Sequence, residues 1–275
     1  MRKIKVIFLI AALLIALIVS GCSNSVNNVT LKSQDIENTD SSWDVIKDDG
    51  ILKVGISPKT LPYVEKTSGG EYTGFLIDMM DEICSRAGIE AEYIEVVNGK
   101  AASMLSDNLI DVILSGYTQV DFGNKNIKWL EPYMTNNHII VCNPDSDINT
   151  KEDLAGKKTG VTEDTVSDIT AQSDIKIDNN MLIKYETEKK AIGALDNGET
   201  DALIIEDAYF YYYTRSHTAK YKILNEIVSA HIHSLGIKKE NLTLSEKLNE
   251  IIAEMKKDKT LEKLSVKWFN TSLIK

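Results

Sequence analysis

The sequence predicts an α/β protein built of two similar lobes, each a β-sheet flanked by helices. Strand-like and helix-like hydrophobic patterns alternate from Trp43 to the C-terminus, which is typical of sheets with parallel strands. The pattern of the first half then returns in the second. Residues 109–113 (LIDVI) and residues 199–203 (ETDAL) each form a short strand that follows a helix and is entered through an aspartate. This repeat indicates two lobes facing one cleft, with ligands expected at the carboxyl ends of the strands.

In the first half of the chain, one helix has the clearest pattern. Residues 77–84 (IDMMDEIC) place apolar side chains at helical spacing, and Gly88 is suited to end that helix. The remaining elements of this half are short apolar runs. We expect strands at 51–56, 91–97 and 110–114 and a short helix at 101–105.

The second half repeats this rhythm and closes with two amphipathic helices. Its strands are short apolar runs between turn signals, and its helices have apolar residues at a spacing of three or four. We expect strands at 138–142, 159–162 and 202–205, and helices at 151–154, 189–195, 244–255 and 260–269.

The composition is that of a folded globular protein with an acidic surface. Of 275 residues, 43% are hydrophobic and 26% are charged, which excludes a disordered or low-complexity chain. The formal net charge is -10. An acidic excess of this size argues against a nucleic-acid partner, because phosphate binding needs a basic face.

The N-terminus has the features of an export signal. Arg2, Lys3 and Lys5 precede an uninterrupted apolar stretch at residues 6–19. This stretch is too short to span a bilayer core of about 30 Å as a helix, so a signal peptide over residues 1–21 is expected rather than an uncleaved anchor. The following residues, up to 43, are mostly Ser, Asn, Thr and Asp, which predicts a flexible tether.

Several segments together resemble a known protein family. The run Val19-Ser20-Gly21-Cys22 resembles the bacterial lipobox, which implies lipidation of Cys22. The order and spacing of further segments resemble the solute-binding proteins of polar amino-acid ABC importers. These segments are 50–55 (GILKVG), 61–63 (LPY), 74–78 (GFLID), 111–118 (DVILSGYT), 131–133 (EPY), 154–158 (LAGKK), 198–202 (GETDA) and 267–269 (KWF).

The resemblance implies a type II periplasmic-binding-protein fold, in which two hinge strands join the lobes. The crossings are expected near residues 135–138 and 228–232. It also implies that the protein captures a small polar ligand by lobe closure and delivers it to an ABC permease, from the extracytoplasmic face of the membrane and anchored by lipid on Cys22. The implied organisation is a tether at 22–43, a first lobe at 44–136 plus 231–275, and a second lobe at 137–230.

The expected ligand pocket departs from the family in its charge. The family's carboxylate-binding arginine falls on Gly123, while an acid, Glu206, stands at its ammonium-binding position. Such a pocket favours an amine or another cationic solute, unless Lys125 or Lys128 replaces the arginine without its bidentate geometry. The candidate ligand-binding residues are Tyr63, Ser115, Tyr117, Thr118, Asp164, Thr165 and Glu206.

For several other residues, a structural role is an alternative to a functional one. Asp164 could instead cap a helix, since Asp is favoured at N-caps. We expect Cys84 and Cys142 to be buried thiols rather than a disulfide. His231 and His233 share one face of a strand, but they lack a nearby third ligand, so hinge packing is expected rather than a metal site. In the aromatic run 209–213 (YFYYY), two or three side chains are expected in the core, and one tyrosine could stack on a cationic ligand.

The sequence contains no recognisable catalytic motif. It has no Gly-x-Ser-x-Gly, His-Glu-x-x-His or P-loop pattern, and no cofactor is expected. The dehydratase enzymes that share the two-lobed fold also need a cation for their substrate carboxylates. The expectation is therefore a binding protein and no enzyme. The alternatives are a ligand sensor that acts through a membrane partner and, less well supported, a cyclohexadienyl-dehydratase-like enzyme.

Overall fold

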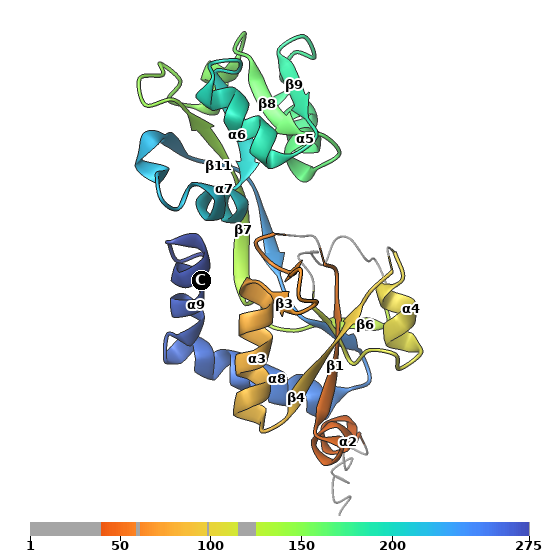
Figure 1. Cartoon of the computed structure of the whole chain (residues 1–275). Helices are drawn as coiled ribbons and strands as arrows, with labels where there is room; N and C mark the ends of the chain where they lie inside the picture. Colours follow the sequence, from red (N-terminus) through yellow and green to blue (C-terminus); the bar gives the residue numbers. More distant parts are fainter. Residues whose placement is uncertain (1–39, 59–60, 98, 115–124, 275) are drawn as a thin grey trace, which may run out of the picture. The chain divides into compact units, whose positions relative to one another are not determined.

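The computed structural model describes residues 40–58, 61–97, 99–114 and 125–274, and within them the chain forms two five-stranded sheets (Figure 1). A two-stranded hairpin of β2 (Glu65–Lys66) and β3 (Tyr72–Thr73) accompanies the first sheet. Each five-stranded sheet has hydrophobic clusters that include its covering helices. This confirms the predicted α/β fold class with two lobes.

The first lobe is built on the strand order β4-β1-β5-β12-β6. Strand β1 pairs in parallel with β4 and β5, whereas β12 is antiparallel to both of its neighbours. Helices α3, α8 and α9 contribute to the core on one face and α4 to that on the other. The bounds are β1 Ile51–Ile56, β4 Glu90–Glu95, β5 Val112–Leu114, β6 Ile127–Trp129, β12 Gly236–Lys238, α2 Ser42–Asp49, α3 Phe75–Ala87, α4 Ala101–Ser106, α8 Leu242–Lys257 and α9 Thr260–Phe269.

The second lobe is built on the order β11-β7-β10-β8-β9. Strand β8 is parallel to β9 and β10, and β7 runs antiparallel between β10 and β11. The bounds are β7 Met134–Cys142, β8 Thr159–Thr162, β9 Leu182–Tyr185, β10 Ala202–Glu206, β11 Lys222–His233, α5 Val166–Thr170, α6 Glu188–Asp196 and α7 Asp207–Thr214, with single helical turns at Lys151–Leu154, Ala171–Ile175 and Thr218–Lys220.

The expectation of parallel sheets is wrong for β7, β11 and β12. A parallel neighbour requires a crossover, usually a helix, that carries the chain back to the same end of the sheet. Only two residues separate the end of β11 from the start of β12, so no helix reverses the chain before β12 pairs with β5. The first sheet is therefore mixed because of β12, and the second because of β7 and β11.

The two hinge strands are β7 and β11, which pair over most of their length (Figure 1). The expected crossings at 135–138 and 228–232 lie within them. The lobes also meet at α7, because Ala208 is buried in the core of the first lobe. Next to it, the Tyr212 ring stacks on Trp268 of α9 at a centroid distance of 6.1 Å.

The folded unit includes the last residues of the expected tether. Helix α2 begins at Ser42, and the Asp40 carboxylate accepts hydrogen bonds from the Thr243 backbone N–H at 2.6 Å and its hydroxyl at 2.9 Å. Asp40 therefore fixes the entry of the chain to the start of α8. No helix within the described ranges is long and apolar enough to cross a membrane.

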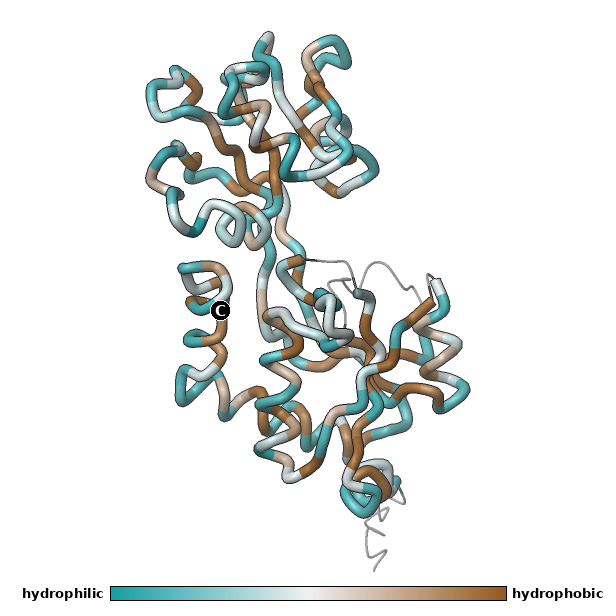
Figure 2. The backbone as a smooth tube through the Cα atoms, in the orientation of Figure 1, coloured by the Kyte–Doolittle hydropathy of each residue, from teal (hydrophilic) through white to brown (hydrophobic). Residues whose placement is uncertain are grey.

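Most of the predicted helices and strands are confirmed, and α9 has the expected bounds. The first half of β11, which includes Lys222, Asn225 and Glu226, was not predicted as a strand, and the burial of β11 alternates only weakly. It is an edge strand next to the buried β7, and pairing with such a neighbour can outweigh a weak local pattern. Figure 2 shows hydrophobic residues concentrated along the inner strands and hydrophilic ones at the turns.

Within the described ranges, Cys84 in α3 and Cys142 in β7 are free and buried, as expected. Burial raises the pKa of the Cys84 thiol to about 12, so this thiol stays protonated and is a poor nucleophile at neutral pH.

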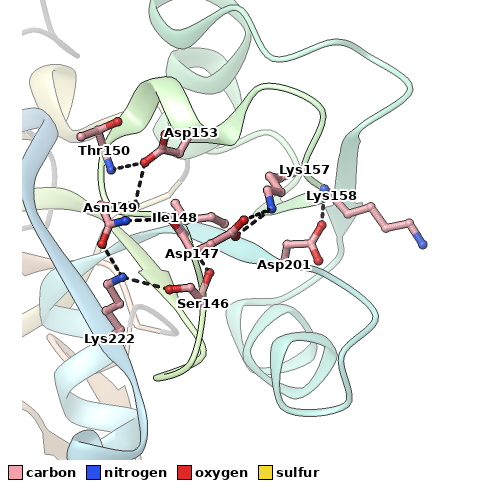
Figure 3. Close-up of polar contacts among 10 residues, drawn as sticks. All are labelled: Ser146, Asp147, Ile148, Asn149, Thr150, Asp153, Lys157, Lys158, Asp201 and Lys222. Carbon is pink, nitrogen blue, oxygen red and sulfur yellow. Dashed lines mark hydrogen bonds and ion pairs between the residues drawn. The ribbon is translucent and has the colours of Figure 1, made fainter.

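The internal repeat has a structural cause. Asp201 accepts a hydrogen bond from the Lys158 backbone N–H at 2.8 Å, and its own N–H donates to the Lys158 carbonyl at 2.8 Å (Figure 3). Asp111 makes the same reciprocal pair with Lys53, at 2.9 and 2.8 Å. In each lobe the aspartate thus locks the start of one strand to the backbone of its parallel neighbour.

We expect Asp201→Ala and Asp111→Ala each to lower the free energy of unfolding by about 1 kcal/mol, the typical net value of one such hydrogen bond. Urea unfolding followed by circular dichroism measures this. The matched control is Asp147→Ala, which removes an ion pair between Lys157 and a carboxylate that is 79% exposed (Figure 3). An exposed pair contributes little, so equal losses in all three variants would contradict the interpretation.

Candidate functional site

The carboxyl ends of β8 and β10 lie side by side in the second lobe. These strands are parallel, with Leu203 opposite Gly160, so the residues that follow them share one edge of the sheet. Asp164 and Thr165 follow β8, and Glu206 ends β10. This is the edge at which open α/β sheets bind ligands.

Tyr63 reaches this edge from the first lobe. The hairpin of β2 and β3 returns the chain, so that the N–H groups of Phe75 and Leu76 donate to the carbonyls of Pro62 and Tyr63, both at 3.1 Å. Gly74 makes this approach possible because its φ is +140° and a Cβ there would lie 2.0 Å from the Tyr63 carbonyl oxygen. The backbone of Tyr63 is therefore held against the start of α3.

The Tyr63 side chain is also fixed by packing. Its ring is 5% exposed, stacks on His233 at a centroid distance of 5.5 Å and lies edge-on to Phe269 at 6.5 Å. These partners come from β11 and α9, so residues far apart in the sequence define the position of one hydroxyl group.

The Tyr63 hydroxyl joins the two lobes. It donates a short hydrogen bond to Glu206 Oε1 and accepts one from Asn136 Nδ2 at 2.8 Å. Asn136 lies on the hinge strand β7 and is itself buried. The structure therefore brings two of the predicted site residues, Tyr63 and Glu206, into direct contact, with an asparagine that sequence reasoning missed.

The site is electrostatically negative. Burial raises the pKa of Glu206, and Asp207 and Glu188 raise it further by charge repulsion, whereas Tyr63 and Asn136 lower it. Burial, then the charge and hydrogen bond of Glu206, hold the pKa of Tyr63 well above its usual value. Tyr63 is therefore the proton donor, and Glu206 has an acceptor to offer a ligand.

A second acid lies directly behind Glu206. Asp207 is 3% exposed and accepts a hydrogen bond from Asn137 Nδ2 at 2.8 Å. Asn136 and Asn137 thus support the two acids from adjacent positions of the same hinge strand. Two neighbouring carboxylates in a poorly hydrated place favour a positively charged partner.

At the predicted pair Asp164–Thr165, the structure corrects the alternative of a helix cap at Asp164. The N-cap of α5 is Thr165, whose Oγ1 accepts from the Asp168 N–H at 3.5 Å, so the alternative of a cap at Asp164 is wrong by one residue. Asp164 is exposed and has a left-handed backbone with φ +58°. Among the described residues, no hydrogen bond joins either residue to Glu206.

Asp168 was missed by sequence reasoning although a signal existed. It is buried and accepts hydrogen bonds from Gln172 Nε2 at 2.6 Å and from Lys184 Nζ at 2.8 Å. Burial alone would raise its pKa, but the Lys184 ammonium, the Asp164 N–H and the Gln172 amide lower it overall. Thr165 and Asp168 match the Thr-x-x-Asp pattern that marks a helix start, which identifies this acid as structural.

Some of the predicted residues lie outside the described ranges. They are Cys22, which is the predicted lipidation site, and Gly123, which is the position of the family's arginine. Three expected pocket residues also lie outside, namely Ser115, Tyr117 and Thr118. Of the two lysines considered as replacements for the arginine, Lys125 is exposed and Lys128 is half-buried on β6, opposite Ile237 of β12.

The aromatic run on α7 is less deeply buried than expected. Only Phe210 is fully buried, and the four tyrosines are half-buried against the cores of the two lobes. Tyr209 and Tyr213 stack on each other at 6.2 Å.

The histidines of the hinge pack against aromatic rings. His233 stacks on Tyr63, and His231 lies edge-on to His138 at 5.3 Å. Burial, then the neighbouring His231 and His233, lower the pKa of His138 to about 4, so its ring is neutral at physiological pH. In the part of the chain that the structure describes, no group of three or more His, Cys, Asp or Glu side chains could hold a metal ion.

We expect Gly74→Ala to displace Tyr63 and to lower the free energy of unfolding by more than about 2 kcal/mol, because strain and a backbone clash coincide. Gly88→Ala is the matched control, since Gly88 also has a positive φ but open space around it. It should cost about 1 kcal/mol. Thermal unfolding of both variants measures the difference, and equal losses would show that the Tyr63 contact does not depend on Gly74.

Comparisons with known proteins agree with this geometry. Residues 52–271 match the family described as bacterial extracellular solute-binding proteins, family 3. The histidine-binding periplasmic protein of Escherichia coli K12 is 26% identical over 227 residues, covering 80% of this chain and 87% of that protein. The arginine-binding extracellular protein ArtP of Bacillus subtilis is 26% identical over 225 residues, covering 79% and 86%.

A solved structure of an ancestral cationic amino acid solute-binding protein superposes with a TM-score of 0.74, at 26% identity, covering 83% of this chain and all of that one. The family match covers most of the sequence, and the two mixed sheets and paired hinge strands are consistent with the superposed structure. The chain therefore has the type II periplasmic-binding-protein fold and belongs to the bacterial extracellular solute-binding proteins of family 3.

Proposed function

We propose that this protein is a lipid-anchored solute-binding protein of an ABC importer, and that it captures a small polar ligand carrying a positively charged amine. The observation that carries the proposal is the Glu206 carboxylate, half-buried at the end of β10 with a second acid, Asp207, beside it. An ammonium group is the natural partner, since burying an unpaired carboxylate is costly and a charge-assisted hydrogen bond offsets that cost.

The lack of an arginine supports an amine over an ordinary amino acid. A ligand carboxylate is best held by the two-pronged guanidinium group, and the sequence has no arginine between Arg86 and Arg215. Three of the relatives are named for arginine, histidine or cationic amino acids, which supports a positively charged ligand, whereas another is named for L-cystine. The ligand class is therefore an amine, a cationic solute or a basic or modified amino acid.

The proposed mechanism is closure of the lobes about β7 and β11. A ligand ammonium held by Glu206 of the second lobe, whose carboxylate also accepts a hydrogen bond from Tyr63 of the first lobe, stabilises the closed arrangement relative to the open one. The permease would then recognise the closed form. The contact between Tyr63 and Glu206 supports this mechanism because it places one side chain from each lobe at the same point.

We expect Glu206→Gln to weaken binding of a cationic ligand at least tenfold, about 1.4 kcal/mol, because the amide keeps the shape but removes the charge. Residues 23–275 are first screened by thermal shift against basic amino acids, polyamines and quaternary amines. A ligand at 100 times its dissociation constant adds about 2.7 kcal/mol of stability. Isothermal titration then compares the variant with the parent protein.

The matched control is Glu262→Gln, which changes a glutamate on α9 whose side chain is 44% exposed and paired with Lys259; it should leave affinity unchanged. Unchanged affinity in Glu206→Gln would contradict the role of this carboxylate. If only neutral amino acids bind, the proposed transport role stands, but the proposed preference for a cationic ligand is contradicted.

We expect Cys22→Ser to release the protein from the membrane fraction, because serine lacks the thiol that the lipid transfer requires. Detergent phase partitioning of the parent and variant proteins from expressing bacteria measures this. The variant retains the apolar stretch at 6–19, so equal membrane association of both proteins would indicate an uncleaved anchor instead of a lipid.

A further inference from the structure

The Glu206 carboxylate is held by a chain of two hydrogen bonds that spans three parts of the molecule. Asn136 Nδ2, on the hinge strand β7, donates to the Tyr63 oxygen at 2.8 Å, and the Tyr63 hydroxyl, from the first lobe, donates to Glu206 Oε1. A tyrosine hydroxyl has a single proton. Because Asn136 uses the oxygen as an acceptor, that proton is directed to the carboxylate.

This arrangement limits the orientations open to the glutamate. Tyr63 cannot follow a moving carboxylate easily, since its ring is packed on His233 and Phe269 and its backbone is held by α3. An ionised carboxylate accepts about four hydrogen bonds, and Tyr63 uses one of them on Oε1. The other acceptor positions, including those of Oε2, are then presented in a fixed direction.

We infer that Tyr63 and Asn136 are positioning residues for the ligand-binding carboxylate: they orient Glu206 and keep it ionised, so that a ligand ammonium meets a prepared acceptor. This inference rests on the proposed function of Glu206. It deepens that function by assigning part of the affinity to two residues that act through the carboxylate.

The charges around Glu206 make this support necessary. Asp207 on α7 and Glu188 on α6 both disfavour its ionised form, as does burial. Opposite Glu206 on β7 stands His138, with its pKa lowered to about 4, and His231 and His233 follow on β11. Among these groups, Tyr63 and Asn136 lower the pKa of Glu206.

A pH dependence follows from the sign of these effects. A cationic ligand needs the ionised carboxylate, so its affinity falls as the pH drops through the pKa of Glu206. Removing the Tyr63 hydroxyl raises that pKa further. The pH at which affinity falls must therefore move upward in Tyr63→Phe.

The experiment measures affinity for L-arginine, L-histidine and putrescine by titration calorimetry between pH 4 and 9. We expect Tyr63→Phe to weaken binding several-fold at pH 8 and to raise the midpoint of the pH profile by roughly half a unit or more. Tyr72→Phe is the matched control, because the Tyr72 hydroxyl donates to Glu95 Oε1 at 2.7 Å away from this site. It should change neither quantity.

A second variant and a second readout keep the inference testable. Asn136→Leu removes the hydrogen bond to the Tyr63 oxygen but keeps the Tyr63 hydroxyl as a donor to Glu206. The midpoint of the pH profile should therefore move upward, as in Tyr63→Phe, but by a smaller amount. The ¹³C chemical shift of the Glu206 carboxyl carbon, titrated in the ligand-free proteins, reports the pKa directly. An unchanged pKa of Glu206 in these variants would overturn the inference. A loss of affinity that is the same at every pH would also overturn it, because it would mean that the Tyr63–Glu206 hydrogen bond only holds the two lobes together.

The two proposals fail in different ways. If the parent protein binds none of the three probes and Glu206→Gln has no effect with any cation, the proposed function fails, while the carboxyl titration still decides whether Tyr63 and Asn136 keep Glu206 ionised. If the parent protein binds a probe but its pH profile is identical in Tyr63→Phe, only the positioning role fails.

Discussion

The hydrogen bond between Tyr63 and Glu206 connects the parts on which the fold and the site depend. It joins a loop of the first lobe to the end of a strand of the second, beside the hinge strand that supplies Asn136. Its formation requires the Gly74 turn, the β2–β3 hairpin and the packing of His233 against the ring. A local change in any of these elements would therefore reach the carboxylate across the lobe boundary.

The second constraint is the burial of negative charge at Glu206 and Asp207. Asp168, elsewhere in the second lobe, has Lys184 as a partner, whereas Glu206 and Asp207 receive hydrogen bonds from a tyrosine and an asparagine. Hydrogen bonds ease the desolvation of a carboxylate but do not neutralise it. A carboxylate whose charge is not neutralised favours a positively charged partner, and this is the physical reason for proposing a cationic ligand at Glu206.

The sequence predicted the site unevenly. Glu206 was identified because it ends an apolar strand at a position where the family has an acid, and Tyr63 because it lies in one of the shared segments. Asn136 was missed, since an isolated asparagine within a strand has no recognisable pattern, and its contact is 73 residues away in the chain. Asp164 was singled out ahead of Asp168, although the helix-capping pattern of Thr165 and Asp168 distinguishes the two.

The sequence alone determined the fold class, the alternation of most strands and helices, and the family, because these depend on hydrophobic periodicity and on the order of local segments. It also showed the repeated aspartates, whose reciprocal bonds to Lys53 and Lys158 have a local cause. Only the tertiary structure decided that β7, β11 and β12 run antiparallel to their neighbours and that the Tyr63 hydroxyl meets Glu206. Such contacts depend on how distant segments pack, and the pattern of a single segment does not encode that arrangement.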